Sequence, residues 1–121
     1  MITGSAKVAI YARYSTDMQR DASIVDQIRR CQERADKEGW GLHNSYTDHG
    51  TSGATLMRPG IQMLLQDAMD GKFGIILSEA LDRLSRDQED IAGIYKRLSF
   101  AGVKIVTLSE GEVNHLHIGL K

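Results

Sequence analysis

Four short apolar runs alternate with longer amphipathic segments along the chain, and this pattern predicts strands separated by helices. The runs are residues 7–13 (KVAIYAR), 42–47, 73–77 (FGIIL) and 103–108 (VKIVTL). Short runs of this kind, bounded by polar residues and glycines, are typical of buried strands. The run at 42–47 is the least apolar, so it predicts the weakest of the four strands.

The first amphipathic segment predicts a helix that ends at Gly39, a common residue after a helix C-terminus. Its apolar residues are four, three and four positions apart, on one helix face: Ile24, Ile28, Cys31 and Ala35. We expect Ser23 to be the N-cap of this helix, with Asp26 three residues later as a weak capping-box partner.

Two further helices follow from the same spacing. The first begins at Pro59, because proline is favoured at the first helical position, and it stops at Gly71. Its apolar face consists of Ile61, Leu64, Leu65, Ala68 and Met69. The second follows a polar segment, residues 78–86, and ends at Gly102. Its apolar residues are Ile91, Ile94, Tyr95 and Leu98.

The resulting order, βαβαβαβ, predicts an α/β fold with three layers: a mainly parallel sheet of four to five strands with helices on both faces. In such sheets, ligands bind outside the carboxyl ends of the strands. The loops that begin at Tyr14, Asp48 and Ser78 all leave those ends. We therefore expect these three loops to meet at one edge of the sheet and to carry the chemistry.

Composition narrows the class of protein. A length of 121 residues suits one domain, and 41% hydrophobic residues exclude a disordered chain. The net charge of −1 excludes a strongly basic tail but not a local cluster of arginines. Cys31 is the single cysteine, so no internal disulfide can form and a reducing compartment, the cytoplasm, is expected. We expect neither a membrane-spanning segment nor a secretory signal, because the apolar runs are short and residues 1–6 lack a long apolar stretch.

The three loops carry serines, arginines and acids: Arg13 and Ser15, then Asp48, Ser52 and Arg58, then Asp82, Arg83, Ser85 and Arg86. A serine hydroxyl beside several guanidinium groups suggests attack on a phosphate. Arginine binds phosphate oxygens with two parallel donors and stays charged. Fixed cations also stabilise the negative charge of a phosphoryl-transfer transition state.

Ordinary structural roles remain open for each of these residues. Arg83 and Arg86 could form helical ion pairs four residues apart, with Asp87 and Asp90 respectively. Arg13 could cap a strand end, and Ser15 could bond to its own turn. For the remaining candidates we expect structural roles, with Cys31 as a core residue. The acids indicate the start of a helix and not a magnesium site: Glu79, Asp82, Asp87, Glu89 and Asp90. The histidines are expected to be surface or loop residues: His43, His49, His115 and His117.

Four motifs resemble those of the serine recombinases, the resolvase and invertase superfamily. They are YARYS (residues 11–15), SIVDQ (23–27), DHGTSG followed by RPG (48–53 and 58–60), and DRLSR (82–86). The motifs occur in the order of the family, and the resemblance covers residues 7–108. The loop containing Gln19 and the SIVDQ segment resemble the large serine recombinases, such as phage integrases and transposon recombinases, more than the small resolvases.

This resemblance implies that Ser15 is the nucleophile that attacks a DNA phosphodiester, leaving a 5′-phosphoserine link and a free 3′-hydroxyl. The arginines matched to the surroundings of the scissile phosphate are Arg13, Arg83 and Arg86, with Arg58 from the second motif. Asp82 matches an acid that takes part in proton transfer to the leaving 3′ oxygen. Gln27 matches a polar residue that supports the site, and Asp48 an acid that orients arginines.

The resemblance also implies that residues 1–121 are a catalytic domain that ends at the start of a long dimerisation helix. The partners implied are double-stranded DNA recombination sites, with a homodimer and a synaptic tetramer in the full-length protein and no membrane. No cofactor or metal is expected, and the gene would be bacterial, phage or mobile-element encoded. The chain alone is expected to be monomeric or weakly associated, because residues 113–121 are too few for a stable helix.

Two other functions fit the same predicted fold. One is a flavodoxin-like domain that binds a phosphate or a flavin, although a flavin site does not need four arginines. The other is a regulatory relative that has lost the ability to cut DNA, although every motif residue is present in this chain. The Arg13–Ser15 pair together with DRLSR favours the enzyme.

Overall fold

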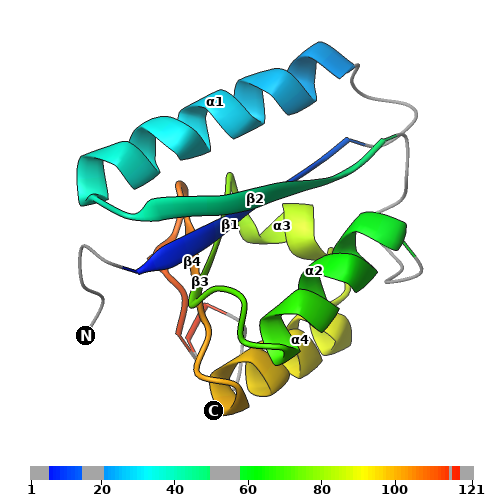
Figure 1. The fold of residues 1–121 in the computed structure, drawn as a ribbon. Helices are drawn as coiled ribbons and strands as arrows, with labels where there is room; N and C mark the ends of the chain where they lie inside the picture. Colours follow the sequence, from blue (N-terminus) through cyan, green and yellow to red (C-terminus); the bar gives the residue numbers. More distant parts are fainter. Residues whose placement is uncertain (1–5, 15–20, 50–57, 115, 118–121) are drawn as a thin grey trace.

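The computed structural model describes residues 6–14, 21–49, 58–114 and 116–117, which contain a five-stranded sheet with helices on both faces (Figure 1). The strands are β1 (Lys7–Arg13), β2 (Gly41–Asp48), β3 (Ile75–Ser78), β4 (Lys104–Thr107) and β5 (Gly111–Glu112). Their order across the sheet is β2-β1-β3-β4-β5. All neighbours are parallel except β5, which is antiparallel to β4. The predicted α/β class and mainly parallel sheet are confirmed.

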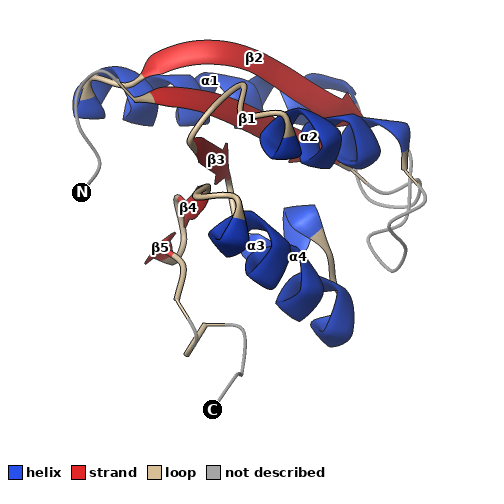
Figure 2. Cartoon of the chain, turned by 60° about the horizontal axis from the view of Figure 1, so that its bottom comes forward, coloured by secondary structure: helices blue, strands red, loops and turns tan. Residues whose placement is uncertain are grey.

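The helices are α1 (Asp21–Glu38), α2 (Pro59–Met69), α3 (Leu81–Leu84) and α4 (Gln88–Phe100). Figures 1 and 2 show α1 on one face of the sheet and the other three helices on the opposite face. This division follows from the strand order. The connection from β1 to β2 and the connection from β2 to β3 cross the sheet in opposite directions, so right-handed crossovers place their helices on opposite faces. Within the described ranges, no helix is long and apolar enough to cross a membrane.

The central strand β1 contributes to two apolar cores, one on each face of the sheet. Val8 and Ile10 belong to the cluster that contains Cys31 of α1. Ala9 and Tyr11 belong to the cluster formed with α2, α3 and α4. Successive strand residues point to opposite faces, which explains this alternation. Burial raises the pKa of the Cys31 thiol to about 12, and the prediction that it is a core residue is confirmed.

The start of α1 differs from the prediction. The helix begins at Asp21, so Ser23 lies inside its first turn and is not the N-cap. There the Ser23 hydroxyl accepts a hydrogen bond from Nε2 of Gln27 at 3.3 Å. The expected capping partner, Asp26, instead forms an exposed ion pair with Arg29 at 3.4 Å. A serine that precedes the apolar face of a helix is a typical N-cap. Its hydroxyl can equally form a hydrogen bond with a polar side chain one turn along the helix.

Two elements were not predicted, and one strand is longer than predicted. The four-residue helix α3 lies within the segment expected to be a polar loop, and β5 has only two residues. Strand β2 has eight residues although its sequence predicts the weakest strand. It lies at the edge of the sheet, where it has one neighbour and four of its eight residues are exposed. An edge strand therefore needs few apolar residues.

Candidate active site at the carboxyl edge of the sheet

The carboxyl ends of β1, β2 and β3 lie side by side, as predicted. Arg13 at the end of β1 is opposite Asp48 at the end of β2, and Tyr11 is opposite Ser78 of β3. The chain leaves β1 and β3 toward opposite faces, so their carboxyl ends form the crevice where doubly wound sheets bind ligands. Ser15, the predicted nucleophile, follows Tyr14 in the sequence and lies outside the described residues.

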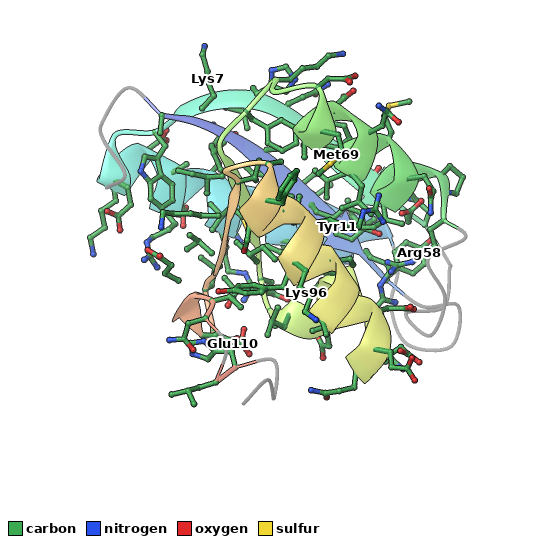
Figure 3. The ribbon with its side chains drawn as sticks, turned by 90° about the horizontal axis from the view of Figure 1, so that it is seen from below. Lys7, Tyr11, Arg58, Met69, Lys96 and Glu110 are labelled. Atoms are coloured by element: carbon green, nitrogen blue, oxygen red, sulfur yellow. The ribbon has the colours of Figure 1, made fainter. Side chains whose placement is uncertain are left out.

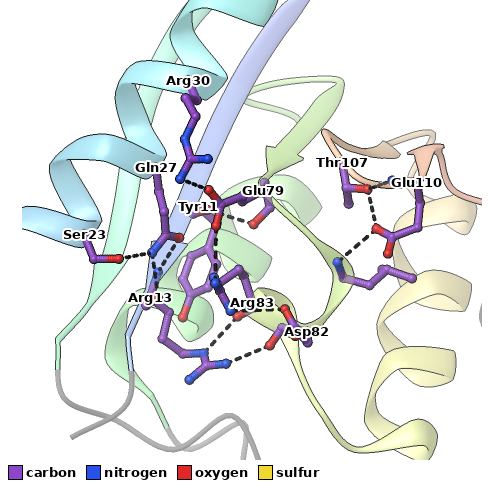
Figure 4. A network of polar contacts seen from close by, with 12 residues as sticks. Tyr11, Arg13, Ser23, Gln27, Arg30, Glu79, Asp82, Arg83, Thr107 and Glu110 are labelled. Atoms are coloured by element: carbon purple, nitrogen blue, oxygen red, sulfur yellow. Dashed lines mark hydrogen bonds and ion pairs between the residues drawn. The ribbon is translucent and has the colours of Figure 1, made fainter. Parts of the chain in front are cut away.

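Arg13 links the end of β1 to helix α3. Its side chain is only 1% exposed. Nε donates to the carbonyl oxygen of Arg83 at 3.1 Å, and Nη2 donates to the carbonyl oxygen of Asp82 at 2.7 Å (Figure 4). Two parallel donors on consecutive carbonyls fix both the guanidinium and the backbone that it contacts. The first and third motifs are therefore held together by direct hydrogen bonds.

Gln27 of α1 holds the backbone of Arg13 from the other side. Its Nε2 donates to the carbonyl oxygen of Arg13 at 3.0 Å, and its Oε1 accepts from the Arg13 N–H at 3.4 Å. The side chain is fully buried, so both of its polar ends depend on these bonds. The pairing of β1 with β3 ends at Tyr11, so the side-chain amide of Gln27 takes the place of a strand partner for Arg13 on that side. This contact fixes the backbone two residues before Ser15.

Arg58, just before α2, is also buried and bonds to protein groups. Nη1 donates to the Tyr11 hydroxyl at 2.8 Å and to the carbonyl oxygen of Arg83 at 3.2 Å, and Nη2 donates to the carbonyl oxygen of Leu84. The guanidinium carbon lies 5.8 Å from the centre of the Tyr11 ring. Figure 3 shows Tyr11 and Arg58 close to the start of α2. Arg58 and Arg13 thus share one carbonyl oxygen of α3.

Asp48 supports Arg58 through Tyr11. One carboxylate oxygen accepts from the Gly60 N–H at 2.8 Å, and the other accepts from the Ile61 N–H at 2.9 Å and from the Tyr11 hydroxyl at 2.6 Å. The two N–H groups belong to the first turn of α2, which otherwise lacks acceptors. Burial, and then the bond to Asp48, raise the pKa of the Tyr11 phenol, which therefore stays a donor. These contacts support the hypothesis that Asp48 orients arginines.

Gly60 allows this approach of Asp48 to α2, and the variant Gly60→Ala is expected to lose stability. A Cβ at position 60 would lie 2.3 Å from the carbonyl oxygen of Thr47 and 2.8 Å from Oδ2 of Asp48. We expect the free energy of unfolding in urea to fall by about 2 kcal/mol, as for other overpacked sites. Gly93→Ala in α4 is the control, since its Cβ meets nothing within 4 Å and should be neutral or stabilising. Equal stability of the two variants would contradict the close approach.

Arg83 and Arg86 differ from the two buried arginines. The Arg83 side chain is 19% exposed and forms ion pairs with Asp82 at 3.2 Å and Glu79 at 3.3 Å. Arg86 is exposed and has no ion pair with a carboxylate in the part of the chain that the structure describes. It lines a hollow of about 430 Å³ together with Asp82 and His117. These two arginines are therefore the ones that a ligand at this edge can reach.

The helical pairs that remained open as an alternative, Arg83 with Asp87 and Arg86 with Asp90, are not formed among the described residues. The cause is a break in the helix: Ser85 is extended, with φ −166° and ψ 150°. Asp87 instead caps α4 by accepting from the Asp90 N–H at 2.9 Å. Residues four apart are neighbours only within one continuous helix.

Positive charge is concentrated around Arg13. Its pKa is lowered, first by burial and then by the nearby guanidinium of Arg58, with further contributions from Arg86 and Arg83. Neighbouring cations in a partly desolvated site repel one another, and such a site favours the binding of an anion. The four arginines that the sequence singled out therefore interact electrostatically around Arg13.

Two residues of the site, Tyr11 and Glu110, were not identified from the sequence. Tyr11 is in the first motif, and its spacing of two from Arg13 was a usable signal, because both side chains lie on the same side of β1. Glu110 accepts from the Leu81 N–H at 3.2 Å and from the Thr107 hydroxyl at 2.5 Å. It thereby supports the first turn of α3 from the β4–β5 turn, a contact that no local pattern predicts.

The histidines are in ordinary surroundings where they are described. The ring of His43 packs against Phe73 at 5.6 Å between centroids, and that of His49 packs against Tyr14 at 5.7 Å. His117 accepts from the Asn114 N–H at 3.0 Å, while His115 lies outside the described residues. Among the described residues, no three His, Cys, Asp or Glu side chains are grouped so as to hold a metal ion.

Known proteins are similar to this chain in sequence. The sequence model of the family described as resolvase, N-terminal domain, matches residues 8–118. A candidate DNA recombinase of Bacillus subtilis (strain 168) is 38% identical over 81 residues, which cover 65% of this chain. The same match covers 16% of that protein, so this chain corresponds to a small part of the length of its relative.

Solved structures share the fold. The N-terminal catalytic domain of TP901-1 integrase superposes with a TM-score of 0.79 at 37% identity, covering 87% of this chain and 78% of that one. The C-terminal catalytic domain of ISC1926 TnpA, an IS607-like serine recombinase, gives 0.77 at 26% identity, covering 84% and 70%. A resolvase family site-specific recombinase from Streptococcus pneumoniae has the same fold, with a TM-score of 0.79 at 24% identity over 95% and 82%.

Proposed function

The chain belongs to the resolvase N-terminal domain family, and from that membership we propose that it is the catalytic domain of a serine recombinase. In this proposal the domain cleaves double-stranded DNA at a specific site and rejoins the strands in a new arrangement. The full-length protein binds its recombination sites as a homodimer and exchanges strands within a synaptic tetramer.

The reaction has two chemically similar steps. Oγ of Ser15 attacks the phosphorus of a DNA phosphodiester, the O–P bond forms, and the bond from phosphorus to the 3′ oxygen breaks. Asp82 takes part in proton transfer to that leaving oxygen, and its side chain is 57% exposed and so can reach DNA. A 3′-hydroxyl from the partner strand then attacks the phosphoserine and releases Ser15. The covalent link conserves the phosphodiester energy, so rejoining needs no ATP.

The four arginines have two different roles in this proposal. In our proposal Arg83 and Arg86, the two that are accessible, contact the phosphate and stabilise the charge on its equatorial oxygens. Arg13 and Arg58 add positive charge, while their donors on the carbonyls of Asp82, Arg83 and Leu84 hold the third motif in place. A dense cluster of cations also lowers the cost of ionising the serine hydroxyl, which is otherwise a weak nucleophile.

One observation carries this proposal. Arg13, two residues before Ser15, donates to two consecutive carbonyls of the segment that contains Arg83 and Asp82. This contact joins the end of β1, two residues before Ser15 in the sequence, to the segment of arginines that follows β3. Neither a flavin site nor a simple anion-binding loop requires a serine two residues after such an arginine.

The test is to trap the covalent intermediate with metal ions removed. The full-length recombinase that contains this domain is incubated with a nicked suicide substrate in excess EDTA, and the adduct is mapped by mass spectrometry. We expect a 5′-phosphoserine adduct on Ser15, because arginines supply the electrophilic stabilisation. An adduct on another residue would contradict the proposal. Cleavage that appears only with added Mg²⁺, without an adduct, would indicate a metal-dependent nuclease.

A further inference from the structure

The guanidinium of Arg83 is held between two carboxylates while one of its donors is unpaired. Nη1 lies 3.2 Å from Asp82 and Nη2 lies 3.3 Å from Glu79. The Nε–H is buried and has no hydrogen-bond acceptor among the residues that the structure describes. A buried donor without an acceptor is costly, and such groups in native proteins call for an explanation, of which a ligand is one.

Glu79 is fixed by three separate elements. It directly follows β3, and its carbonyl oxygen accepts from the Ser109 N–H at 3.1 Å, beyond β4. One carboxylate oxygen contacts Arg83, and the other forms an ion pair with Arg30 of α1 (Figure 4). The Glu79 side chain is 17% exposed, whereas that of Arg30 is 51% exposed. The carboxylate is thus anchored between a surface cation and an arginine of the candidate active site.

We propose that Glu79 is a positioning residue for phosphate binding by Arg83, with Arg30 compensating its charge. Glu79 fixes the orientation of the guanidinium that contacts the phosphate, while the Arg83 Nε–H stays without a protein acceptor among the described residues. A bare carboxylate at this place would repel DNA and neutralise Arg83, and the ion pair with Arg30 offsets that effect. This inference rests on the proposed function and assigns a role to a residue outside the four motifs.

The competing explanation is an ordinary ion pair that contributes little. Exposed pairs such as Arg29 with Glu33 commonly have no measurable effect on stability. Glu79 differs because its contact with Arg83 is largely buried and because Arg83 is an active-site candidate. Stability alone does not separate the two explanations, so the test requires a signal from the Arg83 side chain itself.

The first measurement is NMR of the Nε–H groups in this chain labelled with ¹⁵N-arginine, titrated with inorganic phosphate. In the unmodified chain we expect the Arg83 signal to shift with phosphate. In Glu79→Gln, which keeps the shape but not the charge, it should change before any phosphate is added and respond more weakly. The Arg13 signal should remain, which shows that the site is still folded. An Arg83 signal that is identical in both proteins would overturn the inference.

The matched control is Glu38→Gln, which removes the Arg34–Glu38 pair at 2.8 Å on α1. This variant should change the Arg34 Nε–H signal and leave that of Arg83 unaffected. A second measurement uses the full-length recombinase and the suicide substrate. We expect Glu79→Gln to slow cleavage by about 10- to 100-fold, as when a reacting group is misplaced. Adding Arg30→Gln to Glu79→Gln should have little further effect, because the two residues act as one unit.

The outcomes separate this inference from the proposed function. If the unmodified recombinase forms no adduct, the proposed function fails, while the phosphate titration still decides the role of Glu79. If the adduct forms and Glu79→Gln cleaves at the unmodified rate, the positioning role fails and the proposed function stands.

Discussion

Ser15→Ala in the full-length recombinase is expected to abolish DNA cleavage while leaving DNA binding nearly unchanged. Removal of a covalent nucleophile commonly costs about four orders of magnitude in rate or more, because no other group can form the intermediate. The loss of one loop hydroxyl should change the free energy of unfolding by less than about 1 kcal/mol. Single-turnover cleavage of the suicide substrate and fluorescence anisotropy of labelled DNA measure the two effects separately.

The control for this variant is Ser99→Ala, which removes an exposed hydroxyl from the last turns of α4. It should cleave at the unmodified rate. A covalent adduct formed by Ser15→Ala would assign the nucleophile to another residue. Loss of DNA binding together with cleavage would instead indicate that Ser15 has a structural role.

The second large effect separates the buried Arg58 from the exposed Arg86. Both Arg58→Ala and Arg86→Ala are expected to lose cleavage, but only the first should lose stability. Without Arg58, the carbonyl of Leu84 and the hydroxyl of Tyr11 lose a buried donor. We expect about 3 kcal/mol less stability in urea, the usual scale for breaking a buried charged contact. Arg86→Ala should stay within about 0.5 kcal/mol of the unmodified chain.

Two further variants sharpen this comparison. Arg58→Lys keeps the positive charge but cannot donate in parallel to two carbonyls, so it should rescue neither stability nor cleavage. Tyr11→Phe removes the hydroxyl between Asp48 and Arg58 and should give an intermediate loss. If Arg58→Ala proved as stable as Arg86→Ala, the carbonyl contacts of Arg58 would not be what holds α3.

The sequence was sufficient where one pattern determines the result. The run KVAIYAR predicts strand 7–13, and β1 has those bounds, because a buried central strand is apolar along its whole length. That the carboxyl ends of β1, β2 and β3 lie at one edge of the sheet follows from parallel strands alone. Proline at the start of α2 and glycine after α1 also mark element ends correctly, since their backbone preferences are local.

The sequence was insufficient where a contact depends on distant parts of the chain. The motifs identify four arginines but do not indicate that Arg13 and Arg58 are buried on backbone carbonyls and that Arg83 and Arg86 are accessible. Burial of an arginine requires acceptors, and here they come from the carboxyl end of a four-residue helix that no periodicity predicts. The contacts of Glu79 and Glu110 likewise depend on the positions of β3 and β4 in the sheet.

The support of α3 has a consequence for the order in which the chain is made. This helix is too short to form alone, and it is held at one end by Glu110 and at the other by Arg13 and Arg58. A ribosome has completed every motif residue once it passes Arg86, but Glu110 emerges only after β4. During synthesis, the last of these contacts with α3 therefore forms only when β4 and the turn that follows it are in place. A nascent chain that already carries the serine and all four arginines still lacks the Glu110 contact that supports the first turn of α3.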